Sequence, residues 1–202
     1  FKSSLYFPMK PLKAISKKRF KFRKKIKDSI FYGGIMPNES KNESVFKDCK
    51  LTKYLKNSPL EKLRHFLMVS PYRQQEDFKE NYPNLYSLSN KHKARFKVSK
   101  GLPFFHLPYI TSHFYWALFF LDCSEPFNVS KIHYHNVFPT KLITYLENGL
   151  PIIFNKDLKY SYKILIENNL GFSIEHNEIN FLDSIIKNKY NKYNSYENNI
   201  NN

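Results

Sequence analysis

Two short stretches, far apart in the sequence, carry residue types suited to binding a phosphate. Gly33 and Gly34 end an apolar and aromatic run, and paired glycines let backbone N–H groups approach an anion closely. Pro139, Thr140 and Lys141 precede a helical pattern, where a hydroxyl, a cation and a helix N-terminus favour an oxyanion. Each stretch also fits a purely structural role, because Gly-Gly closes tight turns and Thr140 is the expected helix N-cap.

Other polar residues predict less specific chemistry. His106 lies in a proline-flanked loop, where it could contact a ligand, act as a general base or be purely structural. The spacing of His133 and His135 would suit a metal on a strand, but the absence of a nearby cysteine favours two loop histidines. Asp122 and Glu125 follow an apolar run, and their spacing does not define an acid/base pair. We therefore predict no metal site and assign no catalytic residue.

Strand patterns alternate with helix patterns from residue 28 onward. The helix before Gly149 should end there, because glycine tolerates the left-handed backbone of a C′ residue. Pro151 suits the first position of the following strand, where its missing N–H is tolerated. The expected strands are 29–35, 63–69, 84–88, 94–98, 115–121, 152–154 and 171–174, and the expected helices are 45–56, a polar helix to about 80, 107–113, 141–148, 160–168 and 178–187.

This alternation predicts an α/β domain over residues 28–188, with a doubly wound, mainly parallel, Rossmann-like sheet. In such sheets ligands bind beyond the carboxyl ends of the strands, so the loop after Gly34 and the loop after residue 121 are expected at the ligand edge. Residues 189–202 are rich in Asn, Tyr and Lys, and we expect a disordered, frayed tail there.

Positive charge is concentrated at the start of the sequence. The chain has 33 Lys and Arg against 17 Asp and Glu, and residues 1–29 hold eleven of these cations with the single acid Asp28. Residues 1–27 are expected to form a basic interdomain linker, and contact with an anionic membrane or with nucleic acid is the alternative. The two cysteines form no CxxC pair, which favours a reduced, cytoplasmic compartment, and no apolar run has the length of a membrane span.

Several segments together resemble the C-terminal nucleotide-sugar-binding domain of GT-B glycosyltransferases, of the retaining type that builds bacterial surface polysaccharide. The resemblance covers about residues 28–188, and the segments FYGG, LRHFLMVSP, GLPFFHLP and ILIENNLGFSI contribute to it. It is strongest in FPTKLITYLENGLPIIF, which matches the family pattern P-x-K-[LF]-x-x-Y-L-x-x-G-x-P-x-I. The matching positions are Pro139, Lys141, Leu142, Tyr145, Leu146, Gly149, Pro151 and Ile153.

The resemblance implies transfer of a sugar from a nucleotide diphosphate sugar to a glycan or lipid-linked acceptor, with no metal and no separate cofactor. It implies that Gly33 and Gly34 approach the diphosphate, that Phe105 and His106 lie near the nucleobase, and that residues 138–144 face the phosphates and ribose. The basic residues 1–29 could hold such a cytoplasmic transferase peripherally at the membrane face, near lipid-linked acceptors, and nucleic acid is the less favoured partner.

One position departs from the family pattern. Many members carry a glutamate five residues before the glycine of the block, where it binds the ribose hydroxyls, and this chain has Thr144. Some branches carry a small residue there, so the departure leaves both an active enzyme and an inactive glycosyltransferase-like protein open. A GT-B enzyme also needs a preceding Rossmann-like half, so we expect these 202 residues to be a fragment without transfer activity of its own.

Overall fold

The computed structural model describes residues 25–34, 51–69, 78–100, 106–120, 136 and 138–201. Its strands are β1 (Ser29–Gly34), β2 (Arg64–Val69), β3 (Phe96–Lys100), β4 (Trp116–Phe119), β5 (Ile152–Asn155) and β6 (Gly171–Ile174). Its helices are α2 (Leu51–Asn57), α3 (Phe78–Asn81), α4 (Pro83–Lys91), α5 (Leu107–Thr111), α7 (Thr140–Glu147), α8 (Lys159–Glu167), η4 (His176–Phe181), α9 (Leu182–Lys189), η5 (Tyr190–Lys192) and α10 (Tyr193–Asn201).

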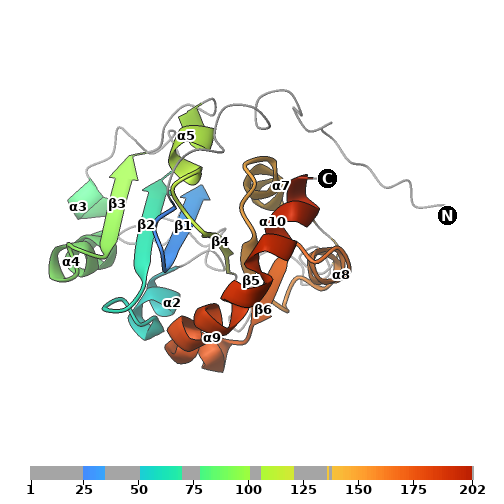
Figure 1. The fold of residues 1–202 in the computed structure, drawn as a ribbon. Helices are drawn as coiled ribbons and strands as arrows, with labels where there is room; N and C mark the ends of the chain where they lie inside the picture. Colours follow the sequence, from blue (N-terminus) through green and yellow to red (C-terminus); the bar gives the residue numbers. More distant parts are fainter. Residues whose placement is uncertain are drawn as a thin grey trace.

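The strands form one six-stranded sheet in the order β3-β2-β1-β4-β5-β6, and every pairing is parallel (Figure 1). This is the doubly wound, Rossmann-like order, so the predicted fold class is confirmed. The order runs outward in both directions from β1 and β4. The point between these two strands, where the chain reverses its direction of winding, is the switch point of the sheet.

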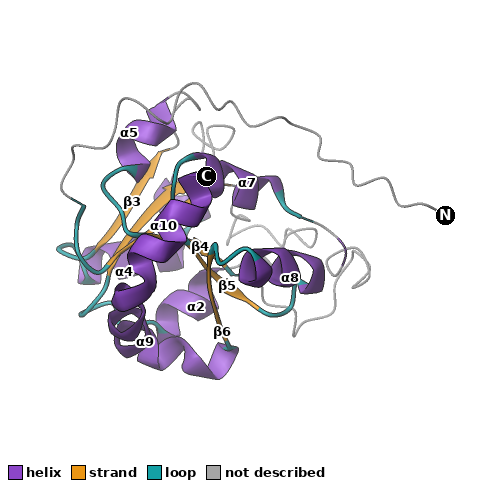
Figure 2. Cartoon of the chain, turned by 45° about the vertical axis from the view of Figure 1, so that its right-hand side comes forward, coloured by secondary structure: helices purple, strands orange, loops and turns teal. Residues whose placement is uncertain are grey.

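Side chains alternate between the two faces of the sheet, and each face has its own core. The first-face core includes Ile30, Trp116 and Ile153, which pack against α2, α4, α9 and α10. The second-face core includes Phe31 and Ala117, which pack against α5, α7 and α8. Figures 1 and 2 show helices on both sides of the sheet, with α10 passing over its middle.

Most predicted elements lie within a few residues of the observed ones, but residues 84–88 do not form a strand. They belong to α4, which begins at Pro83, and proline fits the first helical turn because no N–H is needed there. Tyr82 and Leu85 are buried and Leu88 packs beside them, which is helical spacing. The helices predicted over 45–56 and up to residue 80 are described only from Leu51 and from Phe78 onward.

The prediction of a frayed C-terminal tail is wrong. Residues 190–201 form η5 and α10, and Tyr193 and Tyr196 are buried against Trp116 on the first face. The tyrosines at 190, 193 and 196 recur every third residue, which places them along one side of a helix. That spacing was the available signal, and the surrounding Asn and Lys residues obscured it.

The end of the predicted basic linker is also part of the folded domain. The Lys25 ammonium donates to the Tyr193 hydroxyl and pairs with Glu197 at 2.6 Å. The Asp28 N–H donates to the Tyr190 hydroxyl at 2.8 Å, and this hydroxyl donates to the Asp28 carboxylate at 3.1 Å. Residues 25–28 therefore bind to η5 and α10. Residues 1–24 of the predicted linker lie outside the described part of the chain.

No helix in the described ranges is both long enough and apolar enough to cross a bilayer.

Candidate functional site

The carboxyl ends of β1 and β4 meet at the switch point of the sheet. Gly34 is the last residue of β1 and Phe119 the last residue of β4. In doubly wound proteins the connections on either side of the switch point run to opposite faces of the sheet, and ligands bind at this edge. The Gly-Gly pair predicted from the sequence as a phosphate-binding element therefore lies at the topologically favoured position.

Helix α7 brings Lys141 to the same place, 107 residues further along the chain. The Lys141 ammonium donates to the Tyr32 hydroxyl at 2.6 Å and lies 4.2 Å from the centre of the Tyr32 ring. The ring of Phe119 is 5.7 Å away. The two stretches singled out in the sequence thus converge, and they form a cationic group backed by two aromatic rings.

The backbone conformation of residue 34 explains why it is a glycine. A Cβ atom at this position would lie 2.5 Å from Lys141 Cε, and the backbone φ angle of +144° is one that residues with a side chain rarely adopt. The backbone conformation therefore favours glycine, because the flexible lysine side chain could move aside but the φ angle would remain. The lysine stem runs against the end of β1, and its ammonium bonds to Tyr32 at this edge of the sheet.

Gly33 has a different role from Gly34. Its N–H donates to the Tyr145 hydroxyl at 3.0 Å, and the same hydroxyl lies 3.2 Å from its carbonyl oxygen, to which it donates. Burial raises the pKa of Tyr145 well above its ordinary value, so the phenol stays protonated and can keep donating. This pair of hydrogen bonds holds α7 to the sheet. The Gly33 N–H, which the sequence predicts as a phosphate donor, is therefore already bonded to Tyr145.

The start of α7 differs in one detail from the prediction. The N-cap residue is Pro139, and Thr140 is the first helical residue, without a side-chain cap bond. Proline has no side-chain acceptor, so it cannot cap the helix in the way expected of threonine. Within the described part of the chain, the N–H and hydroxyl of Thr140 have no hydrogen-bond partner, so this helix start retains donors for an anion.

Thr144, which replaces the expected glutamate, bonds within the helix. Its hydroxyl donates to the Thr140 carbonyl at 3.1 Å, a common i−4 contact of helical threonines. The side chain therefore lies along α7 and uses its donor there. Glu147, one turn later, is half-buried.

The remaining predicted residues are only partly described. His106 lies just before α5 and is exposed, and Phe105 lies outside the described residues. His133, His135, Asp122 and Glu125 also lie outside them. No cluster of three or more potential metal ligands occurs in the described ranges.

A polar network at the ends of β5 and β6 was missed in the sequence. Asp157 accepts a hydrogen bond from the buried Asn155 amide at 2.7 Å, and His176 Nε2 lies 3.1 Å from the same carboxylate oxygen. The His176 ring packs edge-on against Phe120, which follows β4, at 4.8 Å between ring centres. Asp157 and His176 are 19 positions apart in sequence, and no motif joins them. The parallel pairing of β5 with β6 brings them to one edge of the sheet.

An exposed ion pair borders this network. Lys156 pairs with Glu175, and this contact, through its hydrogen bond and its charge, lowers the pKa of the Glu175 carboxyl. Glu175 and Glu178 also form a reciprocal capping box that begins η4. Both partners of the ion pair are half-exposed, so we assign it to local order at the end of β6.

Comparisons with known proteins include a distant likeness in structure. No protein-family model matches the chain, and no curated protein matches it in sequence. The fold is similar to that of AviGT4, a glycosyltransferase involved in avilamycin A biosynthesis, with 10% sequence identity and a TM-score of 0.40. The likeness covers 84% of this chain and 42% of that chain, so this chain spans less than half of its length. At this distance the likeness supports no inference about activity.

Proposed function

We propose that this chain is the donor-binding half of a glycosyltransferase and binds the diphosphate of a nucleotide sugar at the switch point. The observation that carries the proposal is the convergence of Lys141 and Gly34, which lie on separate segments. A cation, a glycine at a strand end and a helix N-terminus together suit a diphosphate. The FPTKLITYLENGLPIIF block that resembles the donor helix of GT-B enzymes is the segment that supplies Lys141 and Thr140.

In this proposal the residues of the site either bind the diphosphate or hold α7 in place. Lys141 binds a phosphate oxygen as a point charge, held in place by Tyr32. The N–H and hydroxyl of Thr140 donate to the same diphosphate. Gly34 lets the backbone of β1 approach the ligand, while Gly33 and Tyr145 hold α7 in position.

The test measures binding of UDP, GDP and inorganic pyrophosphate by isothermal titration calorimetry. Lys141→Ala should weaken binding of a nucleoside diphosphate about tenfold or more, since a charge-assisted contact is removed. Lys159→Ala, which removes an exposed lysine from the start of α8, is the matched control and should leave binding unchanged. Binding of no nucleoside diphosphate by the parent chain, or equal affinity of the Lys141 variant, would contradict the proposal.

The role of Thr144 has a separate test. Thr144→Glu restores the carboxylate that many GT-B members use for the ribose hydroxyls. We expect the change to raise affinity for UDP or GDP without changing affinity for pyrophosphate, which has no ribose. Equal gains for all three ligands would argue against a ribose contact at this position. Because GT-B catalysis needs a second domain, we expect no sugar transfer by these 202 residues alone, and robust turnover would contradict that expectation.

A further inference from the structure

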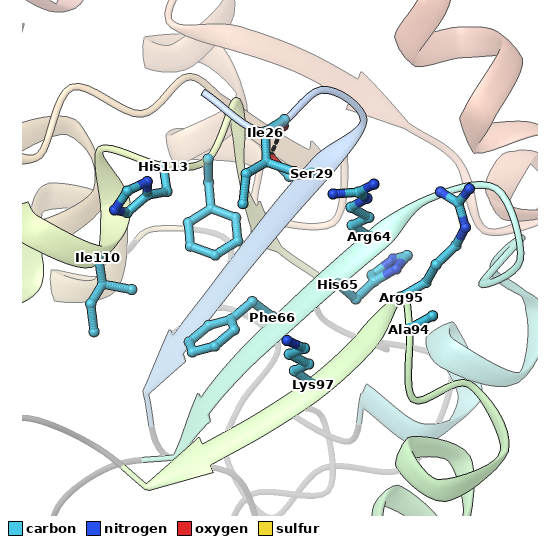
Figure 3. A pocket seen from close by; sticks show the side chains of 11 residues that line it. Ile26, Ser29, Arg64, His65, Phe66, Ala94, Arg95, Lys97, Ile110 and His113 are labelled. Atoms are coloured by element: carbon cyan, nitrogen blue, oxygen red, sulfur yellow. Dashed lines mark hydrogen bonds between the residues drawn. The ribbon is translucent and has the colours of Figure 1, made fainter. Parts of the chain in front are cut away.

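A cavity of about 410 Å³ lies on the second face of the sheet, at the amino ends of β1 and β2 and away from the switch point (Figure 3). Ser29 and Arg64 begin these strands, and Arg95 precedes β3. Ile110 of α5 and His113 form the opposite wall. The cavity lies within the size range of sites for small molecules.

In the described part of the chain, little covers the second face of the sheet over β2. Helices α2 and α4, which lie between β1, β2 and β3 in the chain, pack on the first face. Of the helices in the two described cores, only the five-residue α5 lies over β2 on the second face. Arg64 and Phe66 are two residues apart on β2, and the strand register pairs Phe66 with Lys97 of β3. These side chains therefore project from the same face and line the cavity together.

One wall of the cavity is apolar and fixed. The ring of Phe66 lies 5.3 Å from that of Phe114 and 6.2 Å from that of Phe31, and the last pair is nearly parallel. Ile110 adds an aliphatic surface from α5. This packing holds the rings in place, so an apolar ligand would meet a preformed surface.

The other wall carries positive charge. Arg64, Arg95 and Lys97 line it, and the described lining contains no Asp or Glu. Within the described part of the chain, the Arg64 and Lys97 side chains have no hydrogen-bond or ion-pair partner. Arg95 donates one N–H to the Lys62 carbonyl at 3.1 Å, which orients its guanidinium and leaves its other donors. Three cations of this kind match the charge and the oxygen acceptors of a phosphate.

We propose that this cavity binds an organic phosphate with an apolar body. Arg64, Arg95 and Lys97 bind the phosphate, and Phe66, Phe114 and Ile110 contact the apolar part. The site is separate from the diphosphate site proposed at the switch point, since its residues come from the opposite ends of the strands. Its ligand is recognised by two features together, a charged head and an apolar body, and neither feature suffices alone.

The test is isothermal titration calorimetry of the full chain with decyl phosphate, kept below the concentration at which it forms micelles. Inorganic phosphate supplies the charge without the chain, and decanol supplies the chain without the charge. We expect decyl phosphate to bind at least tenfold more tightly than either. Arg64→Gln and Lys97→Gln should each weaken it about tenfold, since each removes a charged contact from a solvent-exposed side chain without disturbing the core.

Lys159→Gln is the matched control on the far half of the sheet and should bind like the parent. Ile110→Glu puts a carboxylate on the apolar wall that faces the cations and should abolish binding. Melting temperatures of the variants show that each is folded. Equal binding of decyl phosphate and inorganic phosphate, or equal affinity of the parent and both charge variants, overturns the proposal. Binding of vesicles of phosphatidylglycerol and phosphatidylcholine without binding of free decyl phosphate also overturns it, and would assign the surface to a membrane.

Discussion

The two halves of the sheet are covered differently. In the half formed by β4, β5 and β6, described helices pack on both faces, with α7 and α8 on the second face and α9 and α10 on the first. In the half formed by β2 and β3, the described helices lie almost entirely on the first face, and the second face ends in the cavity beneath α5. Helix α5 has five residues, whereas α7 has eight and α8 has nine.

This difference explains the composition of the strands. Trp116–Phe119 and Ile152–Asn155 are buried at every position, and all but one of their residues are hydrophobic. In β2 and β3, exposed Arg64 and Lys97 alternate with buried residues, as in a sheet with one face toward solvent. A strand covered on both faces supports a rigid ligand edge, while a strand covered on one face leaves room for a second site.

The largest expected effect compares one phenylalanine from each half. Phe154→Ala should lower the free energy of unfolding by about 4 kcal/mol, because Phe154 is 2% exposed and its removal leaves a cavity. Phe66→Ala should cost about 1–2 kcal/mol, since Phe66 is half-buried and water can enter the space it leaves. Urea unfolding followed by circular dichroism measures both. Equal costs would mean that the second face is as well covered over β2 as over β5.

The next effect concerns the C-terminal helix that covers the first face. Tyr193→Ala should lower the free energy of unfolding by about 3 kcal/mol, because the buried ring packs 5.1 Å from Trp116. Tyr86→Ala on α4, where the side chain is 39% exposed, is the control and should stay within about 0.5 kcal/mol of the parent. Tyr193→Phe keeps the ring and removes only the bond to Lys25, so about 1 kcal/mol is expected. A neutral Tyr193→Ala would restore the disordered-tail prediction.

The third effect is a pH dependence from His65 on β2. Burial lowers the pKa of His65 to about 4 from an ordinary value of 6.5, and the ring lies 3.3 Å from the Tyr54 hydroxyl and 3.2 Å from that of Ser58. The unfolded chain therefore takes up the proton first as the pH falls below 6.5. Stability should be lost between pH 6.5 and 4, by about 2 kcal/mol from pH 7 to pH 5.

His65→Gln removes this titration. The free energy of unfolding should therefore fall less between pH 7 and pH 5 in the variant than in the parent. Parallel losses in both proteins would show that the His65 ring accepts a proton in the folded state. That result would place an opening on the first face of β2, where the structure has a buried core, and the contrast between the halves would then be larger.

Much of the fold follows from patterns within single segments. The apolar runs at β1, β2, β4 and β5, with helical patterns between them, were sufficient to predict a parallel doubly wound sheet. The errors occurred where local composition outweighed spacing. The composition of residues 84–88 predicts a strand where the structure has α4, and the polar residues around Tyr190, Tyr193 and Tyr196 obscure a buried stripe.

The candidate site was predicted in its parts but not in its contacts. Gly34 and Lys141 were both selected from the sequence, because glycine pairs and helix starts have a local signature. The occupation of the Gly33 amide by Tyr145 was not predicted, since the two residues are 112 positions apart. The Asp157–His176 contact was missed for the same reason.

The sequence by itself therefore determined which segments become strands and helices, and where a glycine or a proline can stand. These depend on backbone sterics and on the periodicity of apolar side chains, which are properties of neighbouring residues. Only the tertiary structure decided that Lys141 lies against Gly34, that α10 covers Trp116, and that Arg64, Arg95 and Lys97 share one cavity. Such contacts depend on strand order and register, because hydrophobic burial is non-directional and many arrangements of the same elements would satisfy the local patterns.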